Sequence, residues 1–319
     1  MNSKIFDKKL GIIGGGQLGK MLLSECAKMG IYTSVLDPSE NSPCKKLSNK
    51  FYCGDFNDYD TVYNFGKECD LITFEIEHIN VDALESLEKI GKAVYPKSNT
   101  LRIIQDKNLQ KSFFKKNNIP TSNFKYFNSL DDLKKSIQKN EIKFPCVWKK
   151  TKFGYDGFGV KILNSLEDIN QLPNSEMIIE DYILFEKELS VIVARNVKKD
   201  IKCYRTVEME FNNNSNQVEY VISPANISDE IDKKAQKIAI KLSESLDSVG
   251  LLAVEMFLTE KEILVNEIAP RPHNSGHFSI EACESSQFQQ HIRAIFNLDL
   301  GETNHSRSEE RRVGKECER

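Results

Sequence analysis

The sequence contains no run approaching the roughly 20 apolar residues that a membrane span requires, and its start, MNSKIFDKKLGIIGGG, lacks the apolar core of a signal peptide. Its eight cysteines include no Cys-x-x-Cys pair and no spacing typical of zinc ligands. The formal net charge is -3, so there is no excess of positive charge to attract nucleic acid or anionic membranes. These absences predict a cytoplasmic protein with reduced thiols that binds neither nucleic acid nor a membrane.

The length and the hydrophobic pattern predict more than one domain. The chain has 319 residues, of which 39% are hydrophobic, and one core rarely holds so many. Strands alternate with helices over residues 9–97, which predicts a parallel α/β sheet, whereas strands dominate from residue 144 to 269, which predicts α+β domains. The expected strands after the first span 31–37, 50–55, 70–79, 144–150, 177–183, 188–195, 201–208, 218–222, 251–258 and 262–268, and the expected helices include 105–121 and 229–248.

The last segment, from residue 304 to 319, differs from the rest of the chain. Charge dominates it, and Val313 is its single aliphatic residue. This composition predicts a solvated tail. The segment also resembles a translated library adapter, in which case the natural chain continues past about residue 303 and the tail is not native.

A glycine-rich turn follows the first expected strand, in LGIIGGGQLGKM. Gly14, Gly16 and Gly19 have the spacing of a dinucleotide-binding turn, and Asp37 ends the second strand where such folds place a ribose-binding acid. Unpaired amides at a helix N-terminus favour an anion. The motif alone leaves two interpretations open, a nicotinamide dehydrogenase and a purely structural turn.

A second glycine segment, WKKTKFGYDGFGV, lies at residues 148–160 and has Lys149 at its start. Exposed amides and an ammonium group can surround nucleotide phosphates, because glycine lets the backbone approach them closely. The sequence is not a Walker A motif, which requires Gly-Lys-Ser/Thr at its end. The alternative is a glycine-rich hairpin turn without a ligand.

Two glutamates are expected to face each other in the hairpin LLAVEMFLTEKEILVNEIAPR. Pairing Leu258 with Leu264 places Glu255 directly opposite Glu267. Like charges repel at such a position, so a cation is expected between them, and two carboxylates suit Mg²⁺, which takes its other ligands from water and phosphate. Asn266 could add an oxygen. The alternative is a pair of solvated glutamates on an outer face, which a one-residue shift in register would favour.

The glycine loop, the lysine and the paired acids together predict a phosphoryl-transfer site on an antiparallel scaffold. A dehydrogenase does not need such a site. The opening glycine turn is therefore expected to hold a substrate instead of a dinucleotide.

The chain resembles the ATP-grasp superfamily and, within it, the 5-(carboxyamino)imidazole ribonucleotide synthase family, from about residue 9 to 302. The stretches that carry this resemblance are GGGQLGKM, LDPSENSPC, TFEIEHI, QDKNLQKSFF, KFGYDGFG, VEMF and NEIAPRPHNSGH. It implies ATP-grasp architecture of mixed α/β and α+β class with a Rossmann-like N-terminal domain at 1–100. The small ATP-grasp subdomain would span 101–178 and the large one 179–303, with the family's small C-terminal domain largely missing.

The resemblance implies a homodimeric enzyme of purine synthesis that joins aminoimidazole ribonucleotide to bicarbonate with ATP and Mg²⁺. Bicarbonate would attack the γ-phosphorus while Lys149 and Arg271 offset the developing charge. Carboxyphosphate, or the CO₂ it releases, would then meet the substrate amine. Either Asp156 or Glu75 would orient or deprotonate that amine.

The resemblance also implies a role for individual residues. Glu255 and Glu267 would hold Mg²⁺, and Lys149, Tyr155, Asp156 and Arg271 would be catalytic. The implied ATP site comprises Arg102, Lys149, Gly154, Tyr155, Asp156, Gly157, Phe158, Gly159, Val160, Glu180, Asp181, Tyr182, Ile183, Glu188, Asn266 and Glu267. The implied ribonucleotide site comprises Gln17, Leu18, Glu75, Tyr155, Asp156, Arg271, His273, Asn274 and Ser275.

Two departures from the family pattern and three rival interpretations accompany this interpretation. EMEF, at 208–211, stands near where many relatives carry a histidine beside the nucleotide, and the C-terminal segment that supplies a lysine and an arginine for the ribonucleotide phosphate is missing. One rival is formate-dependent glycinamide ribonucleotide transformylase, which has a similar fold. A second, of a different class, is an NAD(P)-dependent oxidoreductase built on the first glycine turn. A third is a non-catalytic fragment that only binds nucleotide.

Overall fold

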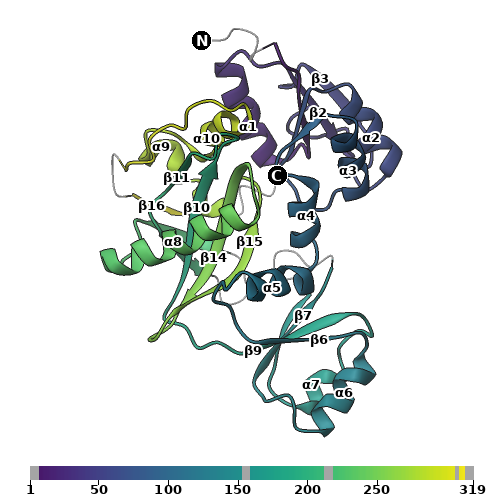
Figure 1. The fold of residues 1–319 in the computed structure, drawn as a ribbon, viewed down its shortest axis with the longest axis vertical. Helices are drawn as coiled ribbons and strands as arrows, with labels where there is room; N and C mark the ends of the chain where they lie inside the picture. Colours follow the sequence, from purple (N-terminus) through teal and green to yellow (C-terminus); the bar gives the residue numbers. More distant parts are fainter. Residues whose placement is uncertain (1–6, 153–158, 212–217, 306–308, 313–319) are drawn as a thin grey trace.

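The computed structural model describes residues 7–152, 159–211 and 218–305, together with the backbone of 309–312. These residues form three β-sheets in three regions of the molecule (Figure 1). The N-terminal sheet and the large sheet lie side by side, and a small sheet projects at the opposite end from the N-terminus.

The N-terminal sheet is parallel, with the strand order β3-β2-β1-β4-β5. LGII and LITF, which form two of its central strands, are buried throughout, as expected for strands covered on both faces. Helices α2 and α3 contribute to the core on one face, and α1 and the distant α10 contribute to the core on the other. The elements are β1 (Leu10–Ile13), α1 (Gln17–Lys28), β2 (Thr33–Asp37), β3 (Lys50–Cys53), α2 (Tyr59–Lys67), β4 (Leu71–Phe74), α3 (Val81–Lys89) and β5 (Ala93–Val94).

Two helices, α4 (Ser98–Ile104) and α5 (Lys107–Lys116), connect this domain to the small antiparallel sheet, whose order is β6-β9-β7-β8. Trp148 is the single tryptophan of the chain and lies in the core of this subdomain. The elements are β6 (Phe124–Phe127), α6 (Leu130–Gln138), β7 (Cys146–Lys150), β8 (Val160–Leu163), α7 (Leu166–Ile169) and β9 (Met177–Asp181). The domain boundary expected at residue 178 falls inside β9.

The large sheet is antiparallel and has the order β15-β14-β10-β12-β13-β16, with β11 paired to β10. Alternation along its strands separates two faces: Leu189 and Val191 point into the core formed with α8, while Glu188 and Ser190 lie on the opposite face. The strands are β10 (Lys187–Arg195), β11 (Ile201–Cys203), β12 (Val207–Phe211), β13 (Val218–Ser223), β14 (Gly250–Leu258), β15 (Ile263–Ala269) and β16 (Glu309–Arg312). The helices are α8 (Asp229–Ser245), the 3-10 turn η2 (Asn274–Gly276), α9 (Ser279–Ala282) and α10 (Gln287–Ile295).

The expected α/β and α+β organisation is confirmed, with three local corrections. The strand predicted over 201–208 is two strands, β11 and β12, which both pair with β10. The strand predicted over 70–79 ends at Phe74. The segment expected to be a solvated tail includes β16, whose backbone pairs with β13, because a free strand edge can bind almost any extended chain.

None of the helices in the described ranges is long and apolar enough to cross a membrane.

The small subdomain allows a local test of core packing, because Trp148 reports on it directly. Leu133 in α6 is fully buried in this core, whereas Leu166 in α7 is 60% exposed. We expect Leu133→Ala to lower the free energy of unfolding by about 2 to 5 kcal/mol, because it leaves a cavity. Leu166→Ala should change it by about 0.5 kcal/mol or less. Urea unfolding followed by Trp148 fluorescence measures both, and equal losses would contradict the packing described above.

Candidate active site

The amides of the opening glycine turn are bound by carboxylates of the same chain. Gly15 N donates to Asp37 Oδ2 at 2.8 Å, and Gly16 N and Gly19 N donate to the two oxygens of Glu75 at 2.7 and 3.3 Å. A Cβ on Gly16 would lie 3.0 Å from Glu75 Oε1, so a larger residue there would push the carboxylate away from the amide. These contacts leave no place for a pyrophosphate on the amides, which argues against the dinucleotide interpretation of the motif.

Glu75 joins this turn to the C-terminal part of the site. Burial raises the pKa of its carboxyl, and the Gly16 amide and the Arg271 charge partly counteract that rise. Arg271 Nε lies 3.1 Å from Glu77 Oε1. The turn at Gln17 and Leu18, which opens α1, therefore lies in the same region as Arg271.

Glu255 and Glu267 are directly opposite each other across β14 and β15, which confirms the predicted facing pair. The predicted register is wrong at the hairpin end, where Leu258 pairs with Ile263 instead of Leu264. A β-bulge at Asn266 absorbs the one-residue difference. The bulge adds Asn266 to the strand beside the acids.

Glu267 and Glu255 have different charged neighbours. Lys107 Nζ lies 2.6 Å from Glu267 Oε2 and lowers the pKa of that carboxyl to about 2. The pKa of Glu255 is raised well above its ordinary value by burial, then by the negative charges of Glu267 and Glu188. The pair therefore has one carboxylate with a cation and one that still lacks charge compensation.

This arrangement fits Mg²⁺. The two carboxylates lie on one face of the hairpin, and Asn266, whose Oδ1 accepts from Lys149 Nζ, is the chain neighbour of Glu267. Within the described part of the chain, no three His, Cys, Asp or Glu side chains gather closely enough to form a metal site by themselves. Two carboxylates suit an ion that takes its remaining ligands from water and substrate phosphates.

Lys149, on β7, brings a second ammonium group to the acid pair. Its Nζ donates to Asn266 Oδ1 at 2.9 Å and lies 3.3 Å from Glu180 Oε1. Lys111 lies 3.1 Å from the other oxygen of Glu180 and donates to Ser122. Burial lowers the pKa of Lys111 to about 8. The small sheet and the large sheet thus meet through buried charges.

Lys107 was not among the residues predicted from the sequence, whereas Arg102 was. Arg102 Nη2 lies 2.7 Å from Asp82 and 3.0 Å from Glu85 on α3, so the structure places it in an ion-pair cluster of the N-terminal domain. Lys107 is the first residue of α5, directly after its N-cap Asp106. A cation at a helix N-terminus opposes the helix dipole, and this unfavourable placement is the signal that could have identified it.

The residues predicted to frame the adenine and bind the ribose, 180–183 and Glu188, lie at the end of β9, just after it, and in β10. Tyr182 is exposed, and Phe185 stacks on Phe257 with ring centroids 4.6 Å apart. Burial, and then the charge of Glu267, raises the pKa of Glu188 to about 7, while Lys149 opposes that rise. In EMEF, where the sequence departs from the family pattern, Glu208 has a local partner, because it accepts from Lys187 Nζ at 2.6 Å.

His273, Asn274 and Ser275 follow β15 and lie at η2. His273 Nε2 lies 3.2 Å from Glu255 Oε1, and its Nδ1 accepts from the backbone N of Ser275 at 3.3 Å. Burial, and then the Arg271 charge, lowers the pKa of His273 to about 3, so its ring is neutral. Asn274 is exposed.

Five predicted loop residues lie outside the described residues: Gly154, Tyr155, Asp156, Gly157 and Phe158. The loop's end is described. Gly159 has a φ of +81°, its carbonyl accepts from Lys150 N at 2.8 Å, and Val160 pairs with Lys149. The glycine segment therefore returns to the strand that carries Lys149.

Comparison with known proteins agrees with this geometry. Residues 7–105 match the model of the ribonucleotide synthetase preATP-grasp domain, and residues 112–288 match that of the ATP-grasp domain. The chain is 39% identical to N5-carboxyaminoimidazole ribonucleotide synthase of Bacillus subtilis, over 92% of this chain and 77% of that protein. The chain belongs to the N5-carboxyaminoimidazole ribonucleotide synthase family. This is the family named above as 5-(carboxyamino)imidazole ribonucleotide synthase.

Solved structures of N5-carboxyaminoimidazole ribonucleotide synthases share the fold. The synthetase from Thermotoga maritima is 45% identical with a TM-score of 0.85, over 93% of this chain and 78% of that one. The synthase from Aspergillus clavatus, in complex with ADP and 5-aminoimidazole ribonucleotide, is 35% identical with a TM-score of 0.85, over the same shares of the two chains. The predicted ATP-grasp fold with its N-terminal preATP-grasp domain is thereby confirmed.

The chain spans only part of its relatives. It is 41% identical to the chloroplastic phosphoribosylaminoimidazole carboxylase of Vigna aconitifolia, covering 93% of this chain but 54% of that protein. The chain thus spans about half the length of that relative.

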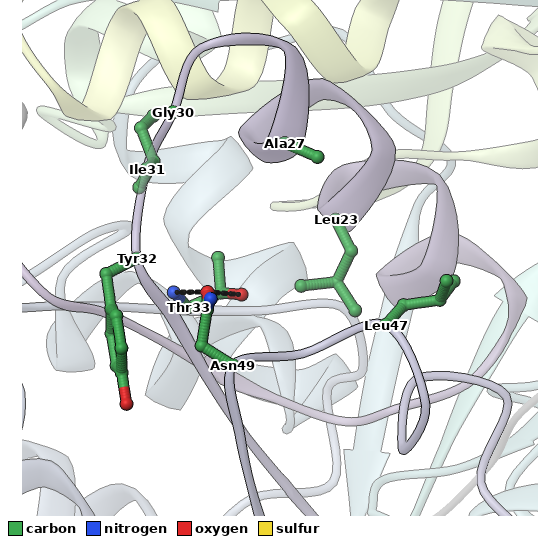
Figure 2. Close-up of a pocket in the computed structure, with 8 residues that line it drawn as sticks. All are labelled: Leu23, Ala27, Gly30, Ile31, Tyr32, Thr33, Leu47 and Asn49. Atoms are coloured by element: carbon green, nitrogen blue, oxygen red, sulfur yellow. Dashed lines mark hydrogen bonds between the residues drawn. The ribbon is translucent and has the colours of Figure 1, made fainter.

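A shallow pocket of about 290 Å³ lies elsewhere, between α1 and the segments that flank β2 (Figure 2). Thr33 donates to Asn49 Oδ1 from both its backbone N and its Oγ1, at 2.8 and 3.2 Å. No residue predicted for the synthase site lines this pocket, and none of its lining residues is charged. It offers no anchor for a nucleotide phosphate.

The raised pKa of Glu188 predicts a pH-dependent stability difference. The folded chain keeps the Glu188 proton up to about pH 7, whereas an unfolded chain releases it near 4.5, so this group's contribution to stability falls as pH rises through that window. Relative to the parent chain, Glu188→Gln should gain about 1 to 3 kcal/mol between pH 4.5 and 7.5.

Chemical unfolding at several pH values, followed by circular dichroism, measures this difference. Glu210→Gln, at an exposed position of β12, is the matched control. A pH-independent difference for Glu188→Gln would refute the raised pKa.

Proposed function

We propose that this chain carries out the ATP-dependent carboxylation of 5-aminoimidazole ribonucleotide with bicarbonate, giving N5-carboxyaminoimidazole ribonucleotide, ADP and phosphate. The observation that carries the proposal is the convergence of Glu255, Glu267, Lys107 and Lys149 from four separate elements. Two facing acids with two ammonium groups beside them suit the phosphate oxygens of ATP and a divalent ion.

In this proposal, the charged groups between the small and the large sheet bind the phosphates of ATP. Lys107 and Lys149 bind phosphate oxygens and offset the charge that develops as bicarbonate attacks. In the free chain these ammonium groups contact Glu267, Glu180 and Asn266, so a phosphate finds them already oriented. When bound between Glu255 and Glu267, Mg²⁺ would neutralise phosphate charge.

The opening glycine turn and the segment after β15 bind the ribonucleotide in this proposal. Arg271 and His273 lie beside Glu77 and Glu255, where they can bind an anionic ribonucleotide next to the phosphate site. Glu75 already accepts two amides of the turn, so we assign it to holding Gln17 and Leu18 in place. Orientation of the amine is then left to Asp156, and the homodimer implied by the resemblance stays a prediction.

Phosphate release tests the proposal against its rivals. With Mg-ATP present, we expect release to be stimulated by 5-aminoimidazole ribonucleotide with bicarbonate, and not by glycinamide ribonucleotide with formate. Mg-ATP should also raise the melting temperature, whereas NAD(H) and NADP(H) should not. Stimulation by formate and glycinamide ribonucleotide alone would overturn the assignment, and protection by a nicotinamide nucleotide alone would favour the oxidoreductase.

A matched pair of variants tests which N-terminal cation binds ATP. Lys107→Met keeps the apolar stem and removes the ammonium, so Mg-ATP affinity should fall about 10- to 100-fold, the value of a charged hydrogen bond. Arg102→Met should lower it less than about 2-fold, because its partners Asp82 and Glu85 lie in an exposed cluster. Isothermal calorimetry measures both affinities, and the opposite order would restore Arg102 as the phosphate ligand.

A further inference from the structure

A buried lysine to which the proposed reaction gives no role contacts the same carboxylate as Lys149. Lys111, on α5, has only 2% of its surface exposed. A buried ammonium group is costly unless its hydrogens find acceptors. Lys111 Nζ lies 2.7 Å from Thr121 Oγ1, 3.0 Å from Ser122 Oγ and 3.1 Å from Glu180 Oε2. These three oxygens match the three hydrogens of an ammonium group.

The hydrogen bonds of the two hydroxyl groups show that Lys111 is charged. Thr121 Oγ1 donates to the carbonyl oxygen of Val265 at 2.7 Å, and Ser122 Oγ donates to Glu180 Oε2 at 2.7 Å. Each hydroxyl uses its single hydrogen in this way, so each accepts from Lys111. The third hydrogen of Lys111 is then left for Glu180 Oε2. Only the ammonium form has three hydrogens, so Lys111 is a cation that neutralises Glu180.

The two oxygens of Glu180 face two different lysines. Its Oε2 faces Lys111, whereas its Oε1 lies 3.3 Å from Lys149 Nζ. Burial opposes ionisation of Glu180, but the charges of the two lysines lower its pKa, so it is a carboxylate. Within the described part of the chain, Oε1 is buried and accepts no hydrogen bond, while Lys149 donates to Asn266 Oδ1. Lys149 is thus attracted to Glu180 without being hydrogen-bonded to it.

We propose that Lys111 is a positioning residue for ATP binding: by neutralising Glu180, it leaves the ammonium group of Lys149 available to a phosphate. Without Lys111, the buried charge of Glu180 draws in Lys149, which then leaves Asn266. A phosphate has to break the new ion pair before it can bind. The effect on ATP rests on the proposed function, whereas the place of Lys149 in the ligand-free chain does not.

Glu180→Gln provides the decisive background, because it removes the charge that Lys111 neutralises. Lys111→Met should act on Lys149 when Glu180 is present and lose this effect when it is combined with Glu180→Gln. If Lys111 only filled space, its loss would cost the same in both backgrounds. Lys111→Gln, whose amide nitrogen still donates two hydrogens, is a second neutral variant.

Lys125→Met is the matched control for the loss of a lysine charge. Lys125 lies on β6 of the same small sheet, and its ion pair with Glu141 is exposed. Exposed pairs of this kind contribute little.

Nuclear magnetic resonance of lysine side chains labelled with carbon-13 tests the position of Lys149 without any ligand. Its Cε signal is assigned by its loss in Lys149→Met. We expect this signal to shift in Lys111→Met and Lys111→Gln, and to stay in place in Lys125→Met. An unchanged signal in both neutral variants of Lys111 overturns the proposal, and either variant suffices if the other does not fold. A shift of equal size in the Glu180→Gln background also overturns it.

Isothermal calorimetry of Mg-ATP binding tests the consequence for the nucleotide. Lys111→Met should lower the affinity about 10-fold or more, the value of a charged hydrogen bond, but less than about 2-fold in the Glu180→Gln background. Lys125→Met should also change it less than about 2-fold. Equal losses in the two backgrounds, or no loss in either, overturn the effect on ATP. If the parent chain fails to bind Mg-ATP, the proposed function fails, while the resonance of Lys149 still decides whether Lys111 positions it.

Discussion

The repulsion between two carboxylates that β14 and β15 hold opposite each other is the constraint around which the site is built. A helix supplies Lys107 to one carboxylate, and His273 approaches the other. The bulge that keeps the acids paired also places Asn266 where it binds Lys149 from another sheet. Lys107 thus compensates the charge of Glu267, whereas Glu255 has only the neutral ring of His273 beside it and keeps a raised pKa. These contacts tie the hairpin to separate parts of the chain.

The opening glycine turn illustrates how one sequence pattern can serve different purposes. Gly14, Gly16 and Gly19 permit the same tight approach in a dinucleotide fold, where the amides meet a pyrophosphate. Here Asp37 accepts from Gly15 N, and Glu75 accepts from Gly16 N and Gly19 N instead. The identity of the partner that occupies the amides, and not the glycine spacing, decides the chemistry of the turn.

Local patterns in the sequence were sufficient to predict most strands and the facing acids, because the alternation of apolar and polar residues and the turn residues act over a few positions. They were insufficient for the bulge at Asn266, which shifts the register by one residue without changing the hydrophobic pattern. Lys107 was missed for a different reason, since it meets Glu267 across 160 positions of chain. The break between β11 and β12 likewise depends on both strands pairing with β10, which no local signal reveals.

The N-terminal sheet is completed by α10, a helix that is synthesised long after it. Leu10 and Ile12 share a core with Phe288 and Ile292 of α10, nearly the whole chain away. While the ribosome is still translating the middle of the message, α1 can cover part of that face but α10 cannot yet, so some of its apolar surface is open to chaperones and to other nascent chains. Full burial of this domain consequently depends on the synthesis of α10, which ties its solubility to a segment far along the chain.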